Sequence, residues 1–147
     1  MKIDRAFSTF LSRLATAFAG ILVVALAILM PRIVRLYIGP EGSGYALILT
    51  LLYGILLFGS LAVAFLWILL SRVSAGSVFS DLSILCLRVL SWSCVGAGIL
   101  FIGLGFMSFY FSFAVGAAAL FLGLILRVVK NCLEEATRIK EENDFTI

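Results

Sequence analysis

Histidine is absent from the sequence, and charged residues make up only 13% of it. The lack of histidine removes the commonest general base and metal ligand in proteins. A soluble domain has about a quarter of its residues charged, so the low charge and the 63% hydrophobic content exclude an ordinary soluble globule. The length of 147 residues fits one domain. A lipid bilayer is the environment that this composition favours.

The sequence also has only three cysteines and no long run of basic residues. Cys86, Cys94 and Cys132 are odd in number and irregularly spaced, which argues against a disulfide framework. We interpret all three as small apolar packing residues. The net charge is only +3 and no long basic run occurs, so we expect no direct nucleic-acid binding.

Four stretches are apolar enough for helices that cross a bilayer, which takes about 20 residues. They predict spans at residues 8–30, 45–70, 82–107 and 113–130, followed by a helical tail at 131–147. Pro31 is expected to end or kink the first span. The basic start of that span, with the small residues at 25–27, also resembles a cleavable signal peptide. More apolar sequence follows at once, which fits a retained anchor better.

The third and fourth spans are continuous in hydropathy. Residues 89–126 contain no charge, which is too long for one ordinary span. We divide them near residues 108–112, in an aromatic cluster, because aromatic rings favour the membrane interface. The segment before residue 45 is rich in glycine and is predicted to turn.

The basic residues predict the orientation. Nine of them fall on one side of a four-span plan: Lys2, Arg5, Arg13, Arg72, Arg88, Arg127, Lys130, Arg138 and Lys140. Only Arg32 and Arg35 fall on the other side. Because cytoplasmic loops carry the excess of lysine and arginine, both termini are predicted to be cytoplasmic, in a bacterial cytoplasmic membrane.

Small residues recur on every predicted span, for example Ala15 and Ala19 on the first and Ser112 and Gly116 on the fourth. Such residues allow close helix packing in lipid. The predicted fold class is therefore all-α: an integral membrane four-helix bundle with both termini inside and a cytoplasmic extension of the last helix. No charged residue lies at mid-membrane depth, which argues against an ion-coupled transporter or a proton pump.

Two segments are predicted to face the cytoplasm. In the first, Ser80 is a candidate helix N-cap, Asp81 suits the positive end of the helix dipole, and Phe79 is placed to staple the first turn. The second is the tail, which from residue 131 onward carries five acids against two bases. An acidic surface favours a basic partner.

The tail also carries an apolar stripe, consisting of Val128, Val129, Cys132, Leu133, Ala136 and Ile139. Opposite charges four residues apart, as in Lys130 and Glu134, support an exposed helix. Two interpretations of the stripe stay open. It packs against Phe79, Leu82 and Leu85, or it is a docking surface for a cytoplasmic partner.

Two motifs resemble a known family. Residues 76–81, followed by Leu87 and Arg88, resemble the stretch that opens the third span in the bacterial membrane family called domain of unknown function 2975. The ending at 138–147 is similar to that family's terminal signature, with Phe145 in place of the usual leucine. The resemblance implies four spans, no known catalytic residue, and partnership with a small helix-turn-helix regulator, whose gene often stands beside the family's genes.

These observations lead us to expect a non-enzymatic regulatory membrane protein, without cofactor or metal, that binds a cytoplasmic helix-turn-helix regulator. The predicted docking residues are Phe79, Ser80, Asp81, Arg88, Glu134, Arg138, Glu141, Glu142, Asn143, Asp144 and Phe145. The alternative is an immunity or transport-accessory protein that acts on a peptide or a lipid-like molecule. Self-association through the small-residue faces also stays open. An enzymatic function is a further alternative, but it would need a general base or paired carboxylates, which we do not find in the sequence.

Overall fold

The computed structural model describes the backbone of residues 2–39, 44–107 and 109–146, and within them the side chains of all except residues 2–6 and 8. It consists of four helices, α1 (Lys2–Ile38), α2 (Tyr45–Ser74), α3 (Asp81–Gly105) and α4 (Phe111–Phe145). The described residues contain no strand. Each helix is long and apolar enough to cross a membrane, so the chain is a multi-pass membrane protein.

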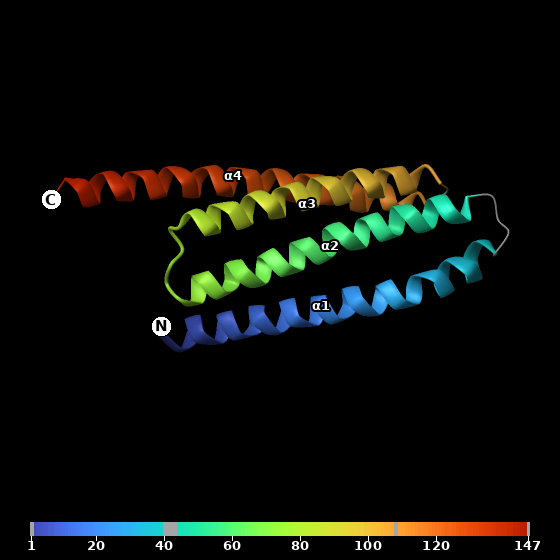
Figure 1. The fold of residues 1–147 in the computed structure, drawn as a ribbon, viewed down its shortest axis with the longest axis horizontal. Coiled ribbons are helices and arrows are strands. Elements are labelled where there is room, and N and C mark those ends of the chain that lie inside the picture. The colour runs from blue at the N-terminus through green and yellow to red at the C-terminus, as the bar shows by residue number, and fades with distance from the viewer. Residues whose placement is uncertain (1, 40–43, 108, 147) are drawn as a thin grey trace.

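The helices lie side by side as an open row (Figure 1). Over the described residues, close backbone approach occurs only between α1 and α2, α2 and α3, and α3 and α4. The all-α prediction with four helices is confirmed, whereas the predicted compact bundle is wrong. Gly20 of α1 packs against Val63 of α2 and Gly54 of α2 packs against Leu100 of α3, whereas Ala15 on the predicted small-residue face of α1 is exposed. The edge helices α1 and α4 do not meet. A small core of Val34, Ile48 and Leu104 lies near the ends where α1, α2 and α3 converge.

The helix boundaries follow the predicted spans with two differences. Pro31 does not end α1, which continues to Ile38. The break between the third and fourth helices lies between Gly105 and Phe111, a few residues earlier than expected, and Ser108 lies outside the described residues. The predicted turn before α2 also falls largely outside them. Gly44, at its end, has a φ of 103°, a conformation that favours glycine.

Glycines set the close packing of α3 on α4. A Cβ atom at Gly116 would lie 2.9 Å from the carbonyl oxygen of Gly98, and one at Gly98 would lie 3.0 Å from the carbonyl oxygen of Gly116. Further along, a Cβ atom at Gly123 would lie 2.9 Å from Val95. The predicted small-residue faces are therefore confirmed for this helix pair, where backbone meets backbone without an intervening side chain.

One buried hydrogen bond also joins the two helices. The hydroxyl of Ser91 donates to the carbonyl oxygen of Gly123 over 2.8 Å. We expect Ser91→Ala to lower the free energy of unfolding by about 0.6 kcal/mol, the average for such bonds within membranes. Thermal unfolding in detergent measures this, with Ser60→Ala as the control, because the Ser60 hydroxyl bonds only within its own helix. Equal losses in both variants would show that the interhelical bond contributes nothing.

Candidate functional site

The loop between α2 and α3 fixes the start of α3 by capping. Ser80 has extended backbone angles, and its hydroxyl oxygen accepts a hydrogen bond from the backbone N–H of Ser83. Asp81 follows in the first turn, where a carboxylate complements the helix dipole. The predicted N-cap is therefore confirmed, and it orients Asp81 at the end of the row where α4 passes.

The far end of α4 continues past the start of α3 as a single helix (Figure 1). The last part of α4 also contacts the loop that precedes α3, because the ammonium group of Lys140 lies 5.7 Å from the centre of the Phe79 ring. This is a cation–π contact between the two segments that the sequence predicted to be functional. The predicted staple role of Phe79 is not tested by any described contact.

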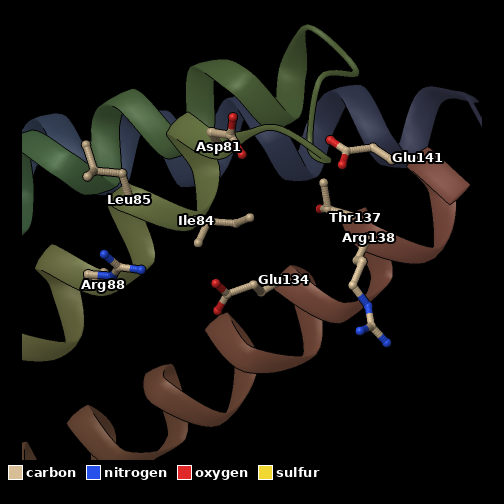
Figure 2. A pocket seen from close by; sticks show the side chains of 8 residues that line it. All are labelled: Asp81, Ile84, Leu85, Arg88, Glu134, Thr137, Arg138 and Glu141. Atoms are coloured by element: carbon tan, nitrogen blue, oxygen red, sulfur yellow. The ribbon is translucent and has the colours of Figure 1, made fainter.

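Between these segments lies a cleft of about 380 Å³, which we call the acidic cleft. It is lined by Asp81, Ile84, Leu85 and Arg88 of α3 and by Glu134, Thr137, Arg138 and Glu141 of α4. Figure 2 shows the carboxylate of Glu134 directed toward α3 and that of Glu141 directed toward the start of α3. The guanidinium of Arg138 points away from the cleft.

The charges around the acidic cleft are partly neutralised. Lys130 binds Glu134 at 2.8 Å. This hydrogen bond and the charge of Lys130 hold the pKa of Glu134 below its usual range, and Arg88 adds to the effect. Arg138 binds Glu135 at 2.6 Å outside the cleft. In the described part of the chain no cation lies within 4.0 Å of the carboxylates of Asp81 or Glu141, and both residues are exposed.

Five of the predicted docking residues line the cleft: Asp81, Arg88, Glu134, Arg138 and Glu141. Glu142 lies beside Arg138, with 3.9 Å between charged atoms. Asn143, Asp144 and Phe145 are exposed at the end of α4, beyond the cleft.

Sequence reasoning missed Thr137, which is buried between α3 and α4, and Ile84, and it named Leu85 only as a packing partner of the tail. Of the two interpretations of the tail's apolar stripe, packing against the start of α3 is wrong for most of its length, because Val128, Cys132 and Ile139 are exposed. The face of α4 that lies next to α3 is a different one, which carries Thr137. The other interpretation, a docking surface, stays a prediction.

The match to a protein family covers both sides of the cleft. The sequence pattern of the family described as "Protein of unknown function (DUF2975)" matches residues 38–147. The chain belongs to this family. The matched region holds α2, α3 and α4 and only the last residue of α1. It includes both motifs that carried the resemblance, at residues 76–88 and 138–147, and confirms that resemblance. No curated protein and no solved structure matches the chain.

The side chains that line the acidic cleft are mostly charged, which suits it to binding a charged surface. The carboxylates of Asp81 and Glu141 line the cleft together with Ile84 and Leu85, and Arg88 adds one cation to the lining. Among the residues that the structure describes, no three histidine, cysteine or acidic side chains lie close enough together to hold a metal ion. The arrangement suits a basic and partly apolar protein surface.

Proposed function

We propose that the protein is a membrane-embedded regulatory partner of a small cytoplasmic helix-turn-helix transcription regulator. The acidic cleft and the end of α4 bind the regulator, with both termini on the cytoplasmic side of a bacterial membrane. The observation that carries the proposal is that the two predicted cytoplasmic segments come together in one cleft, through Asp81 and Glu141. The excess of basic residues at this end of the row supports the orientation.

Charge complementarity gives the proposal its mechanism. A DNA-binding domain presents a basic face to phosphates. The tail, with its net charge of about −3 from residue 131 onward, offers carboxylates to the same kind of face. A regulator that uses the same basic surface for DNA and for the acidic cleft cannot bind the two at the same time. The membrane protein therefore keeps the regulator from DNA until a signal in the membrane alters the cleft.

Co-purification with a small helix-turn-helix regulator, of the kind whose gene the family resemblance places beside this one, tests this proposal. We expect the full chain to retain the regulator at low salt and to release it as salt rises, because exposed charges are screened. A chain truncated after Lys130 keeps the four spans but loses Glu134, Thr137 and Glu141, and we expect it to retain none. Equal retention by both chains would refute the surface assignment.

Two further measurements separate the competing roles. Reporter fusions at residues 76 and 147 are expected to report the cytoplasm for both positions. Deletion of the gene is expected to change transcription from the regulator's target. Unchanged transcription combined with sensitivity to a toxin would favour the immunity or transport-accessory role instead.

A further inference from the structure

A second cleft, separate in chemistry from the first, lies further along the same two helices. Its volume is about 220 Å³, and its lining is basic and aromatic, consisting of Arg88, Ser91, Trp92, Arg127, Lys130 and Asn131. Three cations thus converge from α3 and α4, and none of the described acidic residues lines the cleft. We call it the basic cleft.

The basic cleft lies where the uncharged stretches of α3 and α4 end. Arg88 is the last charge on α3 before the uncharged stretch to Gly105, and Arg127 is the first charge on α4 after Phe111. The uncharged residues 111–126 rise about 24 Å at about 1.5 Å per residue, close to the thickness of a hydrocarbon core of about 30 Å. The basic cleft therefore lies where lipid headgroups lie, whichever face of the membrane this is.

The cations of the cleft are poorly neutralised by the protein itself. The guanidinium of Arg127 lies 4.9 Å from the centre of the Trp92 ring, and 59% of Trp92 is exposed. In the described part of the chain no carboxylate lies within 4.0 Å of Arg88 or Arg127. Lys130 is shared, because it also binds Glu134 at 2.8 Å. Arg88 and Arg127 are both exposed, so an external anion can reach them.

We propose that the basic cleft binds the phosphate headgroup of an anionic phospholipid. Arg88 and Arg127 hold the phosphate, since guanidinium groups form paired hydrogen bonds with phosphate oxygens. Lys130 adds charge in competition with Glu134, and Trp92 lies at the interface, where indole rings are favoured. Basic pockets between helices at a membrane surface are suited to such headgroups. The inference goes beyond the proposed function and does not depend on it.

Native mass spectrometry of the detergent-purified chain tests the proposal, with phosphatidylglycerol and phosphatidylcholine titrated separately. We expect phosphatidylglycerol to bind about tenfold more tightly or better, because each cation at a membrane surface contributes about 1 kcal/mol. The variant Arg88→Gln/Arg127→Gln should lose this preference. The control Arg13→Gln/Arg72→Gln removes two exposed cations outside the cleft and should keep it.

Three outcomes would overturn the proposal. These are an undiminished preference in the Arg88→Gln/Arg127→Gln variant, an equal loss in the control variant, and full competition by inorganic phosphate at the lipid's own concentration, which would identify a free-phosphate site. Glu134→Gln tests it without removing any cation. Because it releases Lys130, we expect it to tighten phosphatidylglycerol binding about two- to threefold, and weaker binding would count against the site.

Discussion

Replacement of Gly116 by valine is expected to destabilise the protein strongly. A Cβ atom at this position would lie 2.8 Å from the Ile102 side chain and 2.9 Å from the carbonyl oxygen of Gly98. The carbonyl belongs to the backbone and cannot rotate away, so α4 must move off α3. Overpacking of this kind costs about 3 kcal/mol. Chemical unfolding in mixed micelles measures the change in free energy.

Gly59 provides the matched control for this experiment. It lies within α2, and a Cβ atom there would meet nothing within 4 Å. Gly59→Val therefore carries the same change in helix propensity without the steric conflict. We expect it to leave the free energy of unfolding nearly unchanged. Similar losses for the two variants would mean that the α3–α4 contact is looser than the structure shows.

Reversal of the charge at Glu141 is expected to have the largest effect on binding of the proposed regulator. Its carboxylate lines the acidic cleft and has no cation within 4.0 Å in the described part of the chain. Lysine at this position would face a basic partner with a like charge, and such contacts cost several kcal/mol. We expect Glu141→Lys to raise the Kd for the regulator at least about tenfold, measured by titration calorimetry in nanodiscs.

Glu135→Lys is the control for Glu141→Lys. It makes the same change in net charge on the same helix, but Glu135 does not line the cleft. Its contact with Arg138 is exposed, and exposed ion pairs contribute about 0–1 kcal/mol. We expect a change in Kd of less than about threefold. If both variants weaken binding equally, the attraction is a property of the whole tail and not of the cleft.

Hydropathy predicted the helices well because the bilayer imposes a length on each uncharged stretch. The cap at Ser80 was also predictable, since local chemistry alone determines it. The row arrangement was not. Small residues occur on all four helices, and their presence does not say which helix each face meets. The pairing of Gly98 with Gly116 depends on the register of a hairpin whose turn carries no polar signal.

The candidate site was predicted as two segments but not as one surface. The apolar stripe did not indicate which face of the tail meets α3. Because α4 is one continuous helix, the contacts of its membrane part with α3 determine that face along the tail as well. Four residues of α4 that lie next to α3 follow one another at intervals of seven: Gly116, Gly123, Lys130 and Thr137. A seven-residue spacing is typical of long helices that pack side by side. Extending it from the glycines would have found Thr137 and the orientation of Lys130.

The unbroken course of α4 has a mechanical consequence. Its 35 residues rise about 52 Å without a proline or a left-handed glycine, so the helix has no built-in hinge. A rod of this kind transmits axial sliding or rotation from one end to the other. A shift of the Phe111 end within the lipid would therefore displace the carboxylates near Glu141 by a similar amount.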